Sequence, residues 1–240
     1  MSSRIKSWKI TLLRHLLVGL IAIGLIYIGW LVHSTWSPHM RLWKAFGVAS
    51  FFLLFIAVSL GPLSKLIPQL IKYVSWRREF GIWFALIGLV HGYLIIDGWA
   101  RWSFWEFLGY QYVADLDMYL RFEPGFGLAN MIGLFALFLG LVLAATSSDK
   151  AIKYLGISSW KWLHGLAYVI FYLSAFHVLY FAFIHYSVAP HRLLMGMPSN
   201  YPLNPLRFYY LGATLIVFFA QTFAFIKIVI QRKRNNFNAK

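Results

Sequence analysis

The sequence predicts an all-α fold, a six-transmembrane helix bundle with cytoplasmic N- and C-termini. Three observations predict it: the composition, six apolar runs and the distribution of basic residues. Hydrophobic residues make up 60% and charged residues 12% of the chain, whereas about 25% of a soluble domain is charged. We therefore expect a multi-pass membrane protein, with residues 1–240 forming a single transmembrane domain.

Six runs are long enough to cross a bilayer, which takes about 20 apolar residues. The predicted spans are residues 16–32, 45–63, 80–96, 126–145, 162–184 and 208–226. Basic residues precede the first span, as they precede a signal peptide, but no small-residue cleavage site follows it. We therefore expect this span to remain as an anchor.

The lysines and arginines are divided unequally between the two sides that these spans define. Sixteen of the 22 fall at the termini and in the second and fourth loops, and six fall on the other side. Because basic loops stay in the cytoplasm, this division places both termini there. The net charge of +15 is then mainly a topology signal that anionic lipid can accept, and we expect no nucleic-acid partner.

Two loops on the predicted periplasmic side are long. Residues 97–125 mix aromatic and charged side chains and hold five of the seven acidic residues, at or within their bounds. This composition suits a helix lying in the membrane interface, as an aromatic belt or as a docking surface for an external partner. The other loop, 187–205, has four prolines and is expected to be irregular.

Missing residue types and motifs exclude several kinds of site. The chain has no cysteine, which excludes thiolate metal sites, iron–sulfur clusters, covalently attached haem and disulfides. It also has no Gly-rich nucleotide loop, no dinucleotide fingerprint and no internal repeat. A nucleotide-binding domain is therefore not expected, and whether the chain is itself an enzyme stays open.

Eight histidines are candidates for a functional site. Five lie at or beyond the ends of spans and are expected to be solvated: His15, His33, His39, His185 and His191. In contrast, His91 and His177 lie well inside two spans that run in the same direction. Each is about ten or more residues from the cytoplasmic end, so the two can meet at similar depth. Ionisable residues at such depth are usually functional.

Three uses for this histidine pair compete. A proton relay usually recruits carboxylates, and no aspartate or glutamate lies deep in a predicted span. A non-haem metal site needs three or four donors. A bis-histidine haem needs one histidine from each of two facing helices, in an apolar pocket with small residues. The neighbours Gly88, Gly92 and Ala175 favour this last use.

The eighth histidine, His164, lies nearer the cytoplasmic end of the fifth span. The 13 residues between His164 and His177 rise about 20 Å along a helix, which suits one site near each face. Thirteen steps of about 100° nevertheless put the two side chains on different faces. Either the helix is locally distorted or the second site is displaced sideways.

Three segments carry a family resemblance: KAFGVASFFLLFIAVSLGPLSKL, RREFGIWFALIGLVHGYL and SSDKAIKYLGISSWKWLHGLAYVIFYLSAFH. They resemble the ferric-reductase-like transmembrane domain of NADPH oxidases and ferric reductases, and most of all the bacterial MsrQ (YedZ) proteins. The resemblance covers residues 44–183, and its specific element is the order and spacing of three histidines. It implies that His91 and His177 ligate a b-type haem nearer the periplasm, and that His164 serves a second haem nearer the cytoplasm.

This chain differs from the oxidases at the position of one further haem ligand. Their inner haem takes a second histidine from the third helix, 13 or 14 residues before the position of His91. This chain has Arg78 and Arg77 there, as MsrQ proteins do, and arginine cannot donate a lone pair to iron. The expectation is therefore one or two haems b. The resemblance offers haem propionates or the phosphate of FMN as partners for the arginines, and positive-inside anchors are the alternative.

The histidines and the resemblance together predict a membrane cytochrome b, and the resemblance implies that it lies in the inner membrane of a bacterium. It would carry electrons from a separate cytoplasmic flavin reductase or a quinol to a periplasmic acceptor, which for MsrQ proteins is the molybdenum protein MsrP. A non-catalytic subunit of a larger membrane complex is the alternative, and the lack of broken or repeated helices disfavours a transporter. The loops 97–125 and 187–205 look longer than in MsrQ proteins, which leaves the acceptor open.

Overall fold

The computed structural model describes residues 2–121, 124–185 and 203–238, which form long helices and one small β-hairpin. Six helical segments are long and apolar enough to cross a membrane, and each contains one predicted span. Their bounds are Trp8–Val32, Pro38–Leu66, Pro68–Trp99, Gly125–Ala145, Ile157–Ile184 and Arg207–Asn238. The prediction of an all-α, six-helix membrane fold is therefore confirmed. Most of the loop 187–205, including His191, lies outside the described residues.

Four of the spans are single helices, and the third is composite. The single helices are α1 (Ser2–Val32), α2 (Pro38–Leu66), α5 (Pro124–Ala145) and α10 (Arg207–Asn238). The third span consists of the 3₁₀ helix η1 (Pro68–Trp76), α3 (Arg77–Leu94) and the π-helical turn η2 (Ile95–Trp99). Both α2 and η1 begin with a proline. The N–H groups at the start of a helix have no partner within the helix, so the N–H group that proline lacks is not missed there.

The fifth span is interrupted, contrary to the prediction of unbroken helices. It consists of α7 (Ile157–Gly165), α8 (Ala167–Leu179) and the π-helical turn η4 (Tyr180–Ile184). The N–H group of Leu166 donates to the carbonyl oxygen of Leu163 at 3.0 Å, a three-residue spacing that tightens the chain at this point. The interruption lies between His164 and His177, and it matches the first of the two predicted alternatives, a local distortion of the helix.

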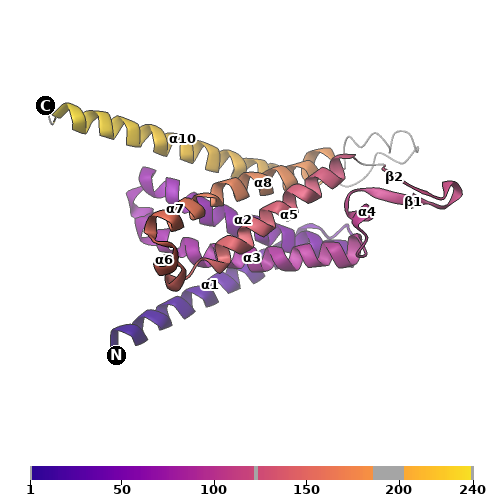
Figure 1. Cartoon of the computed structure of the whole chain (residues 1–240), viewed down its shortest axis with the longest axis horizontal. Helices are drawn as coiled ribbons and strands as arrows, with labels where there is room; N and C mark the ends of the chain where they lie inside the picture. The colour runs from indigo at the N-terminus through magenta and orange to yellow at the C-terminus, as the bar shows by residue number, and fades with distance from the viewer. Residues whose placement is uncertain (1, 122–123, 186–202, 239–240) are drawn as a thin grey trace.

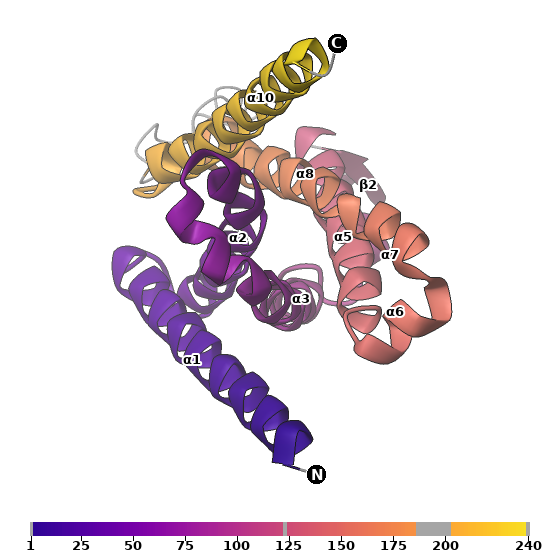
Figure 2. The same cartoon turned by 90° about the vertical axis from the view of Figure 1, so that its left-hand side faces the viewer.

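Helix α2 occupies the middle of the bundle and contacts α1, α3, α8 and α10, as the end-on view shows (Figure 2). Its side chains Leu53 and Val58 are fully buried, together with Phe171 of α8 and Val217 of α10. Gly29 allows α1 to approach closely, since a Cβ atom there would lie 2.9 Å from the Cα atom of Ala45. Small residues at such crossings are typical of membrane helices.

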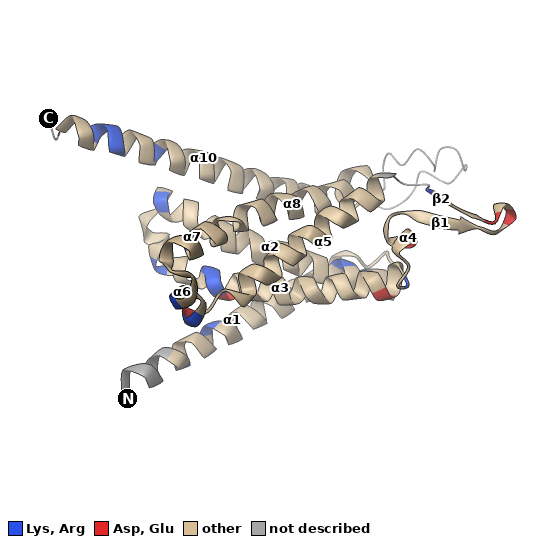
Figure 3. Ribbon diagram, viewed as in Figure 1, with Lys and Arg blue, Asp and Glu red and all other residues tan. Residues whose placement is uncertain are grey.

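The two ends of the bundle differ in charge. Both termini lie at one end and the hairpin lies at the other (Figure 1). Lysines and arginines gather toward the terminal end, whereas acidic residues mark the hairpin and its surroundings (Figure 3). We call these the basic end and the hairpin end. That the basic end faces the cytoplasm remains a prediction from the positive-inside rule.

The predicted interfacial helix in residues 97–125 is wrong for most of the segment. Between η2 and the start of α5, the described residues hold one α-helical turn, α4 (Phe104–Phe107). Strands β1 (Tyr110–Val113) and β2 (Met118–Arg121) form an antiparallel hairpin, joined by the short 3₁₀ turn η3 (Ala114–Leu116). Aromatic side chains favour strands, and Tyr112 faces Tyr119 directly across the pair with ring centroids 5.4 Å apart. A short helix, α6 (Asp149–Leu155), occupies the fourth loop.

Candidate functional site

A cavity of about 220 Å³ lies toward the hairpin end, between α2, α3, α5 and α8. His91 of α3 and His177 of α8 both line it. We call it the hairpin-end cavity. The two histidines that the sequence singled out are therefore brought to one site from two helices.

Both imidazoles are held in the same tautomer. The Nδ1 atom of His91 lies 2.9 Å from the carbonyl oxygen of Trp43, and that of His177 lies 2.7 Å from the carbonyl oxygen of Ala129. A carbonyl oxygen only accepts hydrogen bonds, so each Nδ1 must carry the proton and donate it. Each Nε2 then keeps its lone pair. A hydrogen bond of this kind on the other ring nitrogen is what orients metal-binding histidines.

A glycine makes each of these hydrogen bonds possible. A Cβ atom on Gly47 would lie 3.1 Å from Cε1 of His91, and one on Gly133 would lie 2.7 Å from Nδ1 of His177. In both cases the glycine follows the accepting carbonyl by four residues, and the acceptor and the histidine are 48 residues apart. The same arrangement therefore occurs twice, once between α2 and α3 and once between α5 and α8.

The walls of the cavity between the histidines are apolar or small. They include Gly88, Gly92 and Leu137, and the hydroxyl of Ser50 is occupied by a hydrogen bond to the carbonyl oxygen of Phe84. Among the described residues, no aspartate or glutamate lines this cavity. A flat, largely apolar group with two open axial positions suits such a space.

Polar residues gather where this cavity approaches the hairpin end, and sequence reasoning missed them. His33, His185 and Asn204 are buried and line the cavity, as does Lys44. The prediction that His33 and His185 are solvated is thus wrong, whereas His39 is exposed as expected. His33 is covered because α2 starts only a few residues after α1 ends, and its Nδ1 donates to the carbonyl oxygen of Gly29. Burial also lowers the pKa of His33, which favours the neutral ring.

A second cavity, of about 490 Å³, lies toward the basic end of the same helices. His164, Arg77 and Arg78 all line it, so the structure brings the remaining predicted residues together. We call it the basic-end cavity. No other histidine among the described residues lines it, and His15, a conceivable second ligand, is not part of its wall.

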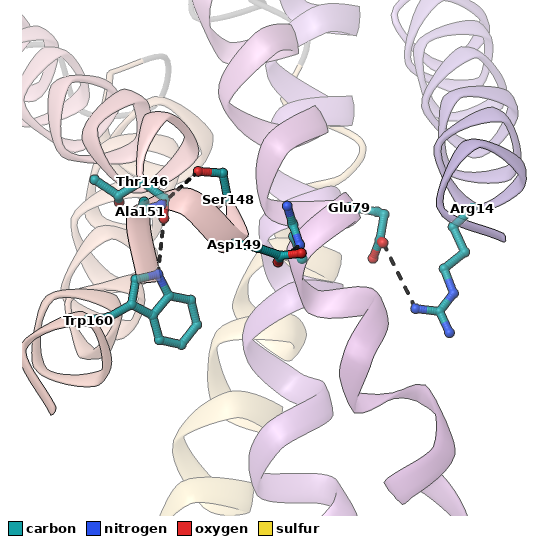
Figure 4. A network of polar contacts seen from close by, with 8 residues as sticks. Arg14, Glu79, Thr146, Ser148, Asp149, Ala151 and Trp160 are labelled. Atoms are coloured by element: carbon teal, nitrogen blue, oxygen red, sulfur yellow. Dashed lines mark hydrogen bonds and ion pairs between the residues drawn. The ribbon is translucent and has the colours of Figure 1, made fainter. Parts of the chain in front are cut away.

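The imidazole of His164 is engaged differently from the first pair. Its Nε2 lies 3.2 Å from the hydroxyl oxygen of Thr146, and its ring stacks on Trp160 with centroids 4.1 Å apart. That hydroxyl donates its own proton to the carbonyl oxygen of Val142 at 2.8 Å, so it accepts the proton of His164. Trp160 is fixed in turn by donating to the carbonyl oxygen of Thr146 (Figure 4). In this arrangement Nε2 of His164 is not open to iron.

The two arginines have separate partners. The Nε atom of Arg77 donates to the carbonyl oxygen of Ala57 at 3.0 Å, and its guanidinium lies beside Gly61. Arg78 forms an exposed ion pair with Asp149 at 2.9 Å. Arg77 is therefore a fixed cation in the cavity wall, whereas Arg78 sits at its solvent edge.

The basic end also contains a buried carboxylate that was not among the predicted site residues. Glu79, only 3% exposed, faces Arg14 of α1 at 4.0 Å (Figure 4). Arg14 also lies over the ring of Trp76 at 5.5 Å. The pairing joins α1 to α3, and it could have been suspected because the two opposite charges occur at similar depth in neighbouring spans.

The two cavities share one lining residue. Phe84 lines both, and Gly140 leaves room for its ring, since a Cβ atom there would lie 2.7 Å from the ring carbon Cε1. Within the described ranges no group of three or more His, Cys, Asp or Glu residues could hold a metal ion directly.

Comparison with known proteins finds a distant similarity to a membrane protein. The chain is 28% identical over 159 residues to a protein-methionine-sulfoxide reductase heme-binding subunit MsrQ from Polaromonas naphthalenivorans, which covers 64% of this chain and 66% of that protein. No protein-family model matches the chain, and no solved structure matches it. The similarity supports at most an MsrQ-like membrane protein.

Proposed function

We propose that this chain is a membrane cytochrome b that transfers electrons across the bilayer, with His91 and His177 as axial ligands of one haem. The observation that carries the proposal is the pair of hydrogen bonds that leaves each Nε2 free at a common cavity. The distant similarity to a heme-binding MsrQ subunit supports the choice of cofactor. Neutral imidazole is a usual axial ligand of haem iron.

The surrounding residues fit this cofactor. A bound haem would supply one-electron chemistry, and the protein would supply ligands, orientation and a dry pocket. Gly47 leaves room for the ring of His91 to lie against α2, and Gly133 leaves room for the ring of His177 to lie against α5. Lys44, His33 and Asn204 offer polar atoms at the hairpin end, where they suit the two carboxylates of haem.

The charge distribution supports an orientation for this transfer. The positive-inside rule places the basic end in the cytoplasm, and we propose that a flavin reductase or a quinol delivers electrons at that end. Arg77, Arg78 and Lys161 line the basic-end cavity and suit the phosphate of FMN or the polar head of a quinone. The acceptor lies on the other side, and the similar protein's name makes a protein-methionine-sulfoxide reductase one candidate.

Absorption spectra of the purified protein test the proposal. We expect one haem b per chain in a pyridine haemochrome assay, with a low-spin spectrum. His91→Ala and His177→Ala should each abolish that spectrum, because either change removes one axial ligand. His39→Ala, at an exposed histidine, is the matched control. A haem-free wild-type protein would instead favour a non-catalytic subunit of a larger membrane complex.

A further inference from the structure

The hairpin of β1 and β2 has no role in the proposed haem site, yet it exposes an unusual amount of apolar surface. Its exposed fractions are 53% for Tyr112, 58% for Leu116, 50% for Met118 and 44% for Tyr119, and neighbouring Trp105 is 50% exposed. Contiguous exposed apolar side chains on a soluble surface usually mark a binding site.

The exposed aromatic rings are already ordered for contact. Trp105 stacks on Tyr119 with centroids 6.2 Å apart and meets Tyr110 edge-on at 5.3 Å. The hydroxyl of Tyr112 donates to Asp117 at the turn. A two-stranded hairpin is marginal alone, and these side-chain contacts stiffen it. A rigid surface loses little conformational entropy when it binds.

The hairpin extends away from the bundle rather than along the membrane surface. It continues the long axis of the molecule beyond the ends of the helices (Figure 1). A bilayer crossed by the helices along this axis would leave the turn at residues 114–117 in water, where exposed apolar side chains favour a protein partner over lipid.

The charge of this segment is opposite to that of the chain. The chain carries +15 overall, yet residues 102–120 contain no lysine or arginine. Asp115 and Asp117 are exposed at the turn, whereas Glu106, near the base, is neutralised by Arg101 at 2.8 Å. An acidic tip disfavours both anionic lipid and a second copy of the same hairpin, and it favours a basic partner.

The base of the hairpin is attached next to the hairpin-end cavity. Asn130 of α5 donates to the carbonyl oxygen of Phe107 at 2.9 Å, and Phe107 lines that cavity. A Cβ atom on Gly127 would collide with the carbonyl oxygen of Leu108, so α5 and this segment touch backbone to backbone. A partner on the hairpin would therefore stand over the cavity that His91 and His177 line.

We propose that the hairpin is the docking surface for a soluble redox protein whose contact face is apolar and ringed by lysine or arginine. Its role as the exit for electrons rests on the proposed function, but the binding itself needs no haem. The turn residues Asp115 and Asp117 attract the basic ring, and Tyr112, Leu116 and Met118 provide the apolar contact.

Binding of cytochrome c, a soluble protein with this kind of surface, tests the proposal. The chain is placed in nanodiscs of zwitterionic phosphatidylcholine, because basic proteins bind anionic lipid. We expect native cytochrome c to bind and its succinylated, acidic form not to bind. Asp115→Lys should weaken binding about five-fold at low ionic strength, and salt should remove the difference. Gln69→Lys, at an exposed site at the other end, should change nothing.

Equal binding of both forms of cytochrome c, or wild-type binding by Asp115→Lys, would overturn the docking surface. The haem assay separates this result from the proposed function. Binding by a haem-free protein refutes only the cytochrome, whereas a haem-loaded protein that does not bind refutes only the docking surface. Leu116→Ala, which removes apolar contact without changing charge, should weaken binding at all salt concentrations.

A spin label tests the lipid alternative. Because the chain has no cysteine, Leu116→Cys gives a single labelling site at the turn. We expect the label to be relaxed by a water-soluble nickel chelate rather than by oxygen, which concentrates in the bilayer. Phe219→Cys, on the exposed surface of α10, is the lipid-facing control. Oxygen-dominated relaxation at Leu116→Cys would place the turn in the membrane and overturn the proposal.

Discussion

The two cavities lie between the same spans, and two pairs of contacting positions in them can be compared directly. In the hairpin-end cavity, Gly47 lies against His91, whose Nδ1 donates to the carbonyl oxygen of Trp43. Gly61 follows Gly47 by fourteen residues on α2, and Arg77 precedes His91 by fourteen residues on α3. Gly61 lies against Arg77, whose Nε donates to the carbonyl oxygen of Ala57. Arginine thus occupies at the basic end the place that histidine occupies at the hairpin end.

The second pair of helices shows the other difference. Gly133 lies against His177, which donates to the carbonyl oxygen of Ala129. Thr146 follows Gly133 by thirteen residues, and His164 precedes His177 by thirteen residues. These two side chains contact each other, and the threonine hydroxyl donates its proton to the carbonyl oxygen of Val142. A histidine within a span is therefore not a ligand by position alone, because its other hydrogen bond decides which nitrogen is free.

The largest expected effect concerns Gly133→Ala, which breaks the arrangement on which the hairpin-end cavity depends. The new methyl carbon would lie 2.7 Å from Nδ1 of His177, so the ring must leave the carbonyl oxygen of Ala129. Loss of such a supporting hydrogen bond typically weakens metal binding about 10–100-fold. Haem titration of the purified protein measures this change. Gly212→Ala, where a Cβ atom meets nothing within 4 Å, should bind haem normally, and equal affinities would refute the geometry.

A double variant tests whether the basic-end cavity is a substituted copy of the other. Arg77→His supplies a second imidazole, and Thr146→Gly releases the carbonyl oxygen of Val142 for His164. We expect haem content to rise above one per chain, with partial occupancy because the cavity walls are otherwise unchanged. Neither single variant should gain haem, since each lacks one of the two requirements. Unchanged haem content in the folded double variant would show that the two levels are not equivalent.

The sequence predicted the six spans because hydrocarbon requires long apolar runs, a constraint that local composition records directly. It did not predict the hairpin, since the aromatic residues of 110–121 suit a membrane interface as well as a strand. The burial of His33 and His185 depends on which segments cover the end of the bundle. His91, His177, His164 and the two arginines were identified from depth and resemblance, and the structure groups them into two cavities.

What no sequence pattern revealed is the hydrogen bonding that distinguishes the three inner histidines. Glycines such as Gly47 and Gly133 are common in membrane helices, and their role becomes clear only from the histidine that each contacts on the facing helix. Thr146 likewise looks like a helix-end residue. The repeated contacts were invisible because they join segments 48 residues apart, without any repeat in the sequence itself.

Gly47→Ala should have a smaller effect than Gly133→Ala and so tests the comparison more finely. A Cβ atom on Gly47 would lie 3.1 Å from the ring of His91, so a shift of a few tenths of an ångström relieves the contact. We expect Gly47→Ala to lower haem affinity by less than about ten-fold, which is the smallest loss expected for Gly133→Ala. The same haem titration measures it, with Gly24→Ala, also in open space, as the control. A greater loss for Gly47→Ala than for Gly133→Ala would contradict the ranking.

The smallest expected effect on haem is that of His164→Ala. Because Nε2 of His164 is bound to Thr146 and its ring rests on Trp160, its removal should leave haem content and the low-spin spectrum unchanged. The donor side should respond instead, because the ring helps to shape the cavity that Arg77 lines. We expect slower haem reduction by a flavin reductase or a quinol analogue, with unchanged reduction by dithionite. His164→Gln, which can still donate to the threonine hydroxyl, should restore part of the rate. Loss of haem from His164→Ala would make this histidine a ligand and remove the distinction between the two cavities.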